Sequence, residues 1–313
     1  MQHYLTLLLF SAPCLQSNAR GESDGNLVTL QKVSMGGTQR TLLSGLGVRW
    51  AIREGFRAVL GEDKVFRHHL DPKTPTGYTY GPKHNPSKKG GLKDLDAAKI
   101  DPLAFIDMRL LGDMATESGG DNNDLSVGRY KRRSQLFVGD AISLAEFKGE
   151  TTFHQGIAPD KEPKKGAKEG AEAKVGDIAP FSVERHFSRY QYRVTVNLDT
   201  VSSEDLQALV SVLLNGLQVG GGHARAASEV VPDAVLWSFH NAPGASGLYN
   251  PEFQHEDGVL NLTDFFNTAE ERGRAIHSAG IFNAPKDAKA PAKLRDVPRV
   301  LALQAADFMK EVK

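Results

Sequence analysis

The stretch 34–60 places the strongest constraint on how this chain folds. From Ser44 onward its apolar residues recur at the spacing of one helix face, at Val48, Ala51, Ile52, Gly55, Phe56, Val59 and Leu60. This pattern predicts an amphipathic α-helix that buries the stripe in a core. Ser44 is a favourable N-cap residue for such a helix.

The same helix also carries a polar signal. Arg49, Arg53 and Arg57 follow one another at four-residue steps beside the apolar stripe and form a cationic ridge. Gly45 and Gly47 leave the first backbone N–H groups uncrowded, and a helix N-terminus of this kind binds phosphate. The sequence therefore indicates contact with a nucleic-acid backbone, although arginines on a helix face are more often only solvated.

Two further local signals accompany this helix. Gly36 and Gly37 precede Gln39 and Arg40, which predicts a flexible loop with another cation. Residues 129–133 (RYKRR) form a second basic patch that includes an aromatic residue. Lysine plus arginine number 38, as do aspartate plus glutamate. A site for an anionic partner must therefore come from such local clusters and not from a global basic field.

The N-terminal segment and the single cysteine bear on the compartment. The apolar run 4–10 lacks the basic segment of a secretory signal, so we interpret it as a buried first strand. Cys14 alone cannot form an intramolecular disulfide or a cysteine-based zinc site. No other stretch is long and apolar enough to span a membrane. We therefore expect a cytoplasmic protein without a membrane partner.

Irregular and strongly patterned segments alternate in the middle of the chain. Residues 62–103 are rich in Pro, Gly, Lys and His without a sustained period, which is typical of a functional insertion. Residues 159–180 have the composition of a solvent-exposed tip or linker. Residues 187–198 alternate strictly, which predicts a strand with one cationic polar face. Together they predict a projecting arm that emerges near Lys148 and returns near Arg189.

A second amphipathic helix is predicted after Ser202 or Ser203, and it stops at the run 219–225 (VGGGHAR). Three consecutive glycines permit close backbone approach by a partner, but a glycine C-cap with a flexible turn is the commoner origin of such a run. The run is not a Walker loop, because no Gly-Lys-Ser/Thr follows it.

The sequence contains few patterns that are typical of catalytic sites. The sequence has no HExxH pair, no nucleophile elbow and no dinucleotide fingerprint. Glu22 and Asp24 could bind a divalent ion, but two carboxylates in a Gly/Asn loop are more often turn formers. We therefore expect a binding protein and not an enzyme, with no cofactor and no metal.

Several short motifs follow one another in a distinctive order. They are 11–13 (SAP), 17–20 (SNAR), 36–40 (GGTQR), 43–45 (LSG), 112–116 (GDMAT) and 220–225 (GGGHAR). Arg49 and Arg53 lie in the helix after the fourth motif. This order, over most of residues 1–240, resembles the repeated backbone subunit of CRISPR type I Cascade effectors, in the DevR/CasC branch of the RAMP superfamily.

The resemblance implies an α+β fold. A modified RRM-like (ferredoxin-like) palm with an antiparallel sheet would form a single domain over 1–313. A helical and irregular fingers insertion would span 61–128, and a protruding thumb β-hairpin would span 148–189. Copies would stack head to tail along a guide RNA, and the thumb of one copy would turn out a base where it meets the next.

The resemblance also implies which residues bind RNA. By position, the guide would contact Asn18, Arg20, Gln39, Arg40, Ser44, Gly45, Arg49, Arg53, Gly221, Gly222, His223 and Arg225, with Met114 beside the displaced base. Such contacts read phosphate and ribose, whereas sequence is read by guide–target pairing. The implied partners are crRNA, target DNA through the guide, further copies of the chain, and the guide-end-capping, large and repeat-processing Cascade subunits.

Two alternatives stay open at this point. A type III-like subunit would cut target RNA beside the guide with a loop aspartate and a metal, for which Glu22 and Asp24 are the candidates. A lone RNA-binding module unrelated to CRISPR is the other. The zero formal net charge is unexpected for a protein that coats a guide.

Overall fold

The computed structural model describes residues 3–16, 23–66, 69–70, 78–79, 102–114, 131–157, 178–219, 228–241, 281–282 and 299–300. Their largest element is a nine-stranded sheet in the order β21-β20-β19-β1-β16-β12-β6-β5, with β11 also paired to β16. Its strands are β1 (Tyr4–Ser11), β5 (Lys32–Met35), β6 (Thr38–Leu43), β11 (Leu136–Val138), β12 (Ala141–Ser143), β16 (Tyr190–Asn197), β19 (Pro232–His240), β20 (Ile281–Phe282) and β21 (Arg299–Val300). Only β20 and β21 pair in parallel among these strands. The described fold is therefore mixed α/β and dominated by an antiparallel sheet.

Strand β1 lies at the centre of the sheet, between β16 and β19. Alternate side chains of a strand point to opposite faces. Leu5, Leu7 and Leu9 accordingly share one buried cluster with alternate residues of β16 and β19. The interpretation of the apolar run 4–10 as a buried first strand is confirmed.

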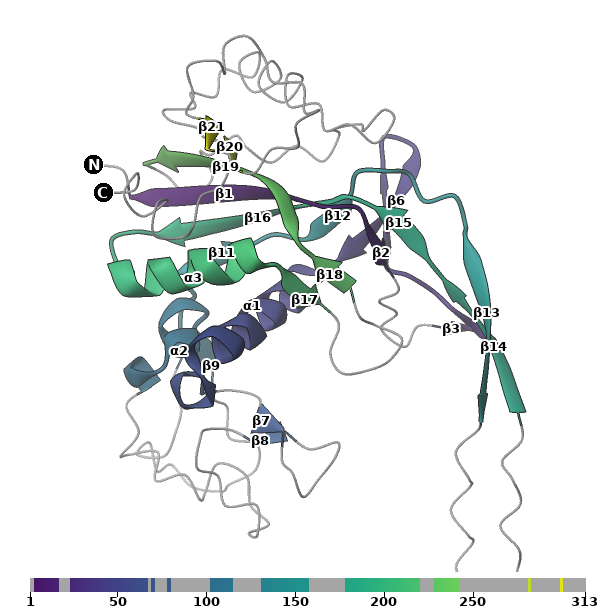
Figure 1. The fold of residues 1–313 in the computed structure, drawn as a ribbon, viewed down its shortest axis with the longest axis horizontal. Helices are drawn as coiled ribbons and strands as arrows, with labels where there is room; N and C mark the ends of the chain where they lie inside the picture. The colour runs from purple at the N-terminus through teal and green to yellow at the C-terminus, as the bar shows by residue number, and fades with distance from the viewer. Residues whose placement is uncertain are drawn as a thin grey trace, which may run out of the picture.

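Two long helices, α1 (Gly45–Leu60) and α3 (Ser203–Asn215), cover the same face of this sheet (Figure 1). Ser44 caps α1 as predicted. The buried part of the predicted stripe is Val48, Ala51, Ile52 and Phe56. Val59 and Leu60 are 45% and 37% exposed. The core contact of α1 therefore ends one turn earlier than the spacing predicts.

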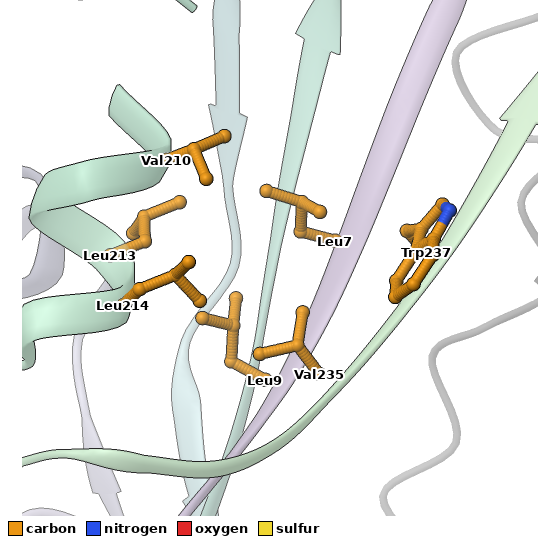
Figure 2. A pocket seen from close by; sticks show the side chains of 7 residues that line it. All are labelled: Leu7, Leu9, Val210, Leu213, Leu214, Val235 and Trp237. Carbon is orange, nitrogen blue, oxygen red and sulfur yellow. The ribbon is translucent and has the colours of Figure 1, made fainter. Parts of the chain in front are cut away.

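The two helices approach closely at Gly55. A Cβ atom at this position would lie 2.3 Å from Cγ1 of Val212 on α3, so glycine is required for this packing. Figure 2 shows a small void between α3 and the sheet, lined by Leu7, Leu9, Val210, Leu213, Leu214, Val235 and Trp237. No charged side chain lines it, so it is a packing gap in the core rather than a ligand site.

The predicted cationic face of residues 187–198 is wrong in part. Gln191 and Thr195 of β16 are fully buried, and Arg193 is half-buried. The Thr195 hydroxyl lies 2.7 Å from that of Thr6 on β1. A strand in the middle of a sheet is covered more completely than an edge strand, so its alternation does not mark one solvent face.

A smaller sheet extends away from the main one (Figure 1). It has the order β13-β14-β4-β3, formed by β3 (Ser23–Asp24), β4 (Leu27–Val28), β13 (Thr151–Ile157) and β14 (Ile178–Glu184). The antiparallel pair β13–β14 lies within 148–189, and we call it the arm. The chain leaves this smaller sheet after β4 and joins the main sheet at β5. Between them the buried Leu30 donates its N–H to Glu184 instead of to a strand partner.

The remaining described elements are short. They are β2 (Cys14–Gln16), η1 (Glu62–Lys64), β7 (His69–Leu70), β8 (Tyr78–Thr79), η3 (Pro102–Ala104), α2 (Ile106–Leu110), β9 (Asp113–Met114), β10 (Lys131–Arg132), β15 (His186–Ser188), β17 (Leu217–Val219) and β18 (Ser228–Val230). In the part of the chain that the structure describes, no helix combines the length and apolar character needed to cross a membrane. Much of the fingers range 61–128 and of the thumb range 148–189 lies outside the described residues, so these bounds stay predictions.

Candidate nucleic-acid interface

The β5–β6 hairpin ends in a tight, open turn. Gly36 and Gly37 have φ angles of 58° and 83°, and a Cβ atom at either position would contact nothing within 4 Å. Two consecutive residues with positive φ are what a two-residue hairpin turn needs, which explains the glycine pair. Gln39 follows on β6 with an exposed side chain. This turn therefore presents backbone and one amide side chain to solvent.

Arg40 does not share that exposure. Its side chain is buried, and its Nη1 donates to the backbone carbonyls of Ser143 (3.1 Å) and Leu144. Burial lowers the pKa of the Arg40 guanidinium. The expectation of a solvent-facing cation in this loop is therefore corrected, because the guanidinium ties β6 to the segment after β12.

At the start of α1, two of the backbone N–H groups already have hydrogen-bond acceptors within the protein. The N–H of Gly45 donates to Oδ1 of Asp140 at 2.6 Å, and the N–H of Gly47 donates to the Ser44 hydroxyl at 3.2 Å. A Cβ atom on Gly45 would lie 2.8 Å from the carbonyl oxygen of Val138, so glycine is required for this close approach. The predicted uncrowded helix terminus is thus a glycine-dependent contact with the loop between β11 and β12.

The arginine row of α1 is not a free cationic ridge. Arg53 is 8% exposed, and its Nε donates to the buried Asp107 at 3.2 Å. Arg57 pairs with Glu54 on its own helix. Arg49 is half-buried and donates to the Ser134 hydroxyl (3.1 Å) and to a backbone carbonyl. The predicted ridge is corrected in this respect, because the returning segments of the chain cover this side of α1.

Burial also affects the pKa of Arg49. It lowers the pKa of the Arg49 guanidinium, and the nearby charge of Arg53 lowers it further. Arginine remains protonated at neutral pH in spite of such shifts. The half-exposed side chain therefore keeps a positive charge at the surface, next to the basic patch in which Arg133 is exposed.

Three distant segments converge on the N-terminal half of α1. The segment after α2 reaches Arg49 through the carbonyl of Leu111 and leads into β9. There Met114 pairs with Lys131 of β10, which belongs to the basic patch. Strand β17 also lies against α1, where a Cβ atom on Gly47 would be 3.4 Å from Cγ1 of Val219. The structure thus brings the helix start close to the strand that leads into the glycine run.

The other predicted site residues cannot be placed in the same way. Asn18, Arg20, Gly221, Gly222, His223 and Arg225 lie outside the described residues. Asp24 is exposed at the end of β3, and within the described ranges no group of three or more His, Cys, Asp or Glu residues is arranged to hold a metal ion.

Sequence reasoning missed the partners that hold this region together. Asp107, Asp140 and Ser134 contact α1 from 54 to 95 positions away along the chain. No periodicity or motif marks such pairs.

Comparison with known proteins gives consistent results. A family model described as "CRISPR-associated negative auto-regulator DevR/Csa2" matches residues 15–273. A protein of Myxococcus xanthus (strain DK1622), named CRISPR-associated protein Cas7/Cst2/DevR, is 27% identical over 252 residues, which are 79% of this chain and 75% of that protein.

Solved structures with a similar fold come from the same kind of assembly. One chain, from a "CRISPR RNA-guided surveillance complex, pre-nicking", has a TM-score of 0.60 at 14% identity and covers 99% of this chain and 98% of its own length. Another, from a "CRISPR RNA-guided surveillance complex", has a TM-score of 0.55 at 14% identity, with coverages of 99% and 100%. At this level of identity the similarity concerns the fold.

Proposed function

Because the chain belongs to the DevR/Csa2 family of CRISPR-associated proteins, we propose that it is the repeated backbone subunit of a type I Cascade-like complex. In this proposal it binds guide crRNA without regard to base sequence and catalyses no reaction. The observation that carries the proposal is that the half-exposed Arg49, the segment at Ser134 and strand β17, which leads into the glycine run, meet at the N-terminal half of α1. The open β5–β6 turn is connected to the same helix through β6.

The fold supports a palm-and-insertions arrangement. Along the chain, β1, α1, β12, β16, α3 and β19 alternate as β-α-β-β-α-β, with the strands in the order β19-β1-β16-β12. This is the pattern of a ferredoxin-like unit, so we propose an RRM-like palm. The fingers would then be the insertion within 61–128, and the arm β13–β14 would belong to the thumb.

The guide would lie along the outer side of the converging segments. We assign direct contacts to Gln39, Ser44 and Arg49, with Asn18, Arg20, Met114, Gly221, Gly222, His223 and Arg225 completing the surface. The buried Gly45, whose N–H donates to Asp140, would hold the helix start in place beneath this surface. Arg40 and Arg53 would support this surface from inside, since their guanidiniums are engaged with carbonyls and with Asp107. Contacts of this kind bind phosphate and ribose and leave the bases free to pair with target DNA.

The same proposal names the partners. Further copies of the chain would stack head to tail, and the guide-end-capping, large and repeat-processing subunits would complete the complex. A cytoplasmic location follows from this role, because guide and target meet there.

The test is to purify the chain from cells that express its CRISPR locus and to sequence the RNA that copurifies. A uniform small RNA with repeat-derived ends and several protein copies per RNA supports the proposal. Random RNA or none contradicts it. Magnesium-dependent cutting of guide-paired RNA that is lost in Asp24→Ala would instead favour the type III-like alternative.

Variants locate the surface. Gln39→Glu should weaken guide binding equally for different guide sequences, because it places a negative charge beside the open turn. Arg49→Gln should lower the dependence of binding on salt by about one phosphate contact. Val59→Glu is the matched control, since Val59 is exposed at the far end of α1 and its added charge lies away from the proposed surface. Equal loss in all three variants would contradict the assignment.

A further inference from the structure

A partly buried ion pair joins the end of β14, where the arm returns to the main sheet (the root of the arm), to the β5–β6 hairpin. Glu184, the last residue of β14, is 7% exposed, and Nζ of Lys32, the first residue of β5, lies 2.7 Å from each of its carboxylate oxygens. The N–H of Leu30 donates to Oε2 of Glu184 at 2.7 Å. Charge-assisted hydrogen bonds in such a partly water-excluded place are stronger than surface ion pairs. The carboxylate therefore fixes the end of β14 by three short contacts, two to Lys32 of β5 and one to Leu30 just before it.

Phe147 extends this connection to the outgoing side of the arm. Its ring centroid lies 4.8 Å from Nζ of Lys32, a cation–π contact, and its N–H donates to the carbonyl of Gln39 at 2.7 Å. Its ring also meets that of His186 edge-on, with centroids 5.5 Å apart. The segment that leads into β13 is thereby held to β6 within a few residues of the open turn.

A further contact holds the returning side of the arm. Nδ1 of His186 lies 2.7 Å from the Thr41 hydroxyl on β6, and that hydroxyl is 2.6 Å from the Tyr190 hydroxyl on β16. Both ends of the arm are thus attached to one hairpin, whose turn is formed by Gly36 and Gly37 and whose strand β6 carries Gln39. A displacement of that hairpin would move the root of the arm with it.

We propose that Lys32 and Glu184 are positioning residues that couple the β5–β6 turn to the orientation of the arm. This inference rests on the proposed function, in which the turn faces the guide and the arm contacts the next copy. A guide that holds the turn also favours the arm orientation that the ion pair sets. Coupling is reciprocal, so a correctly placed arm in turn favours binding of the turn to the guide. Loading of successive copies is then cooperative.

The first experiment needs no RNA. Hydrogen–deuterium exchange is compared between the wild type, Glu184→Gln, Lys32→Met and the control Lys64→Met, whose ion pair with Asp63 is mainly exposed. In Glu184→Gln and Lys32→Met the amides of β13 and β14 should exchange about tenfold faster, while α1 and α3 stay as protected as in the wild type. Unchanged exchange in the arm would overturn the inference, as would an equal increase in α1 and α3, which would indicate general destabilisation.

The second experiment measures the coupling itself. The proteins are titrated onto a guide RNA long enough for several copies, and binding of the first copy is separated from the steepness of later loading. Glu184→Gln should reduce the steepness and leave first-copy affinity within about twofold of the wild type. Unchanged steepness would refute the coupling. If the wild type itself binds no guide RNA, the proposed function fails, and the exchange result still decides whether the ion pair orients the arm.

Discussion

Helix α1 is buried on two sides in two different ways. One side places Val48, Ile52 and Phe56 against the sheet and α3. The other side places Arg49 and Arg53 against α2 and the segment before β11. The first side is held by burial of apolar surface, which has no preferred direction. The second is held by hydrogen bonds and an ion pair, each of which needs its partner in place.

The difference determines how each side responds to change. An apolar contact is sensitive to the volume of a side chain, because protein cores are close-packed. A buried charge is sensitive to the loss of its partner, because an unpaired charge away from water is costly. On the polar side of α1, loss of a single partner should therefore cost much of the unfolding free energy. On the apolar side, the loss of unfolding free energy should grow with the change in side-chain volume.

The largest effect is expected on the polar side, from Asp107→Ala. The Asp107 carboxylate is fully buried and accepts hydrogen bonds from Nε of Arg53 (3.2 Å) and from the N–H of Phe66 (2.9 Å). Its removal leaves a buried guanidinium without its ion partner, so unfolding free energy should fall by about 3–5 kcal/mol. Urea unfolding followed by circular dichroism measures this fall.

Two controls make that prediction specific. Asp63→Ala removes one partner of an exposed ion pair and should leave the unfolding midpoint nearly unchanged. The double variant Arg53→Met with Asp107→Leu removes both charges and should recover the part of the stability that the uncompensated guanidinium costs, while the N–H of Phe66 lacks this acceptor in both variants. If the double variant is as unstable as Asp107→Ala, the cost lies in packing or in the lost Phe66 hydrogen bond and not in the unpaired charge, and the contrast between the two sides is wrong.

A smaller effect is expected on the apolar side, from Gly55→Ala. The added methyl group would lie 2.3 Å from Cγ1 of Val212, which forces α1 and α3 apart. Overpacking of this kind costs about 1–3 kcal/mol, although alanine by itself favours a helix over glycine by about 1 kcal/mol. Differential scanning calorimetry should therefore show a lower melting temperature.

A double-mutant cycle tests the cause. Val212→Ala removes the atom that the new methyl group meets, so Gly55→Ala should cost far less in that background. The coupling energy between the two positions is then clearly non-zero. Strict additivity would mean that the clash is relieved elsewhere, and the close approach of the helices would not explain the glycine.

The sequence was sufficient to predict what covers the apolar side of α1, but not what covers its polar side. The spacing of Val48, Ile52 and Phe56 identifies which residues share a helix face, and burial of an apolar face follows from its chemistry alone. The same spacing groups Arg49 and Arg53, but whether water, RNA or the chain covers them depends on where residues 105–136 return. Asp107 lies in a five-residue helix with no local sign of its role.

The arm shows the same division. Strict alternation located the strand β16. The lysine-rich residues before it lie largely outside the described residues, so the exposed tip predicted there stays a prediction. The contacts that orient the arm join residues 152 positions apart, Lys32 and Glu184, and no local pattern specifies them. Of the predicted guide contacts, the structure describes the side chains only from Gln39 to Arg53, so the contribution of residues 18–20 and 221–225 stays a prediction.

The smallest effect is expected from pH, to which the polar side of α1 and the root of the arm should respond differently. Arginines hold the former and do not titrate in the physiological range, whereas His186 lies at the latter. Burial lowers the pKa of His186 below its ordinary value of 6.5, as does the charge of Arg40, while the Glu146 backbone and Glu150 act in the opposite direction. The unfolded chain therefore binds this proton first. Stability should be full above about pH 6.5 and decline as the pH falls below that value.

The readout for this prediction is local. Hydrogen exchange between pH 7.5 and 5.5, corrected for intrinsic rates, should show lost protection in β6 and β15 while the contact of α1 with α2 stays unchanged. His186→Asn keeps a polar group near the Thr41 hydroxyl but removes the titration, so it should flatten the pH dependence in β6 and β15 alone. An identical pH dependence in this variant would assign the effect to another of the ten histidines. The polar contacts of α1 and of the arm root would then not differ in their response to pH.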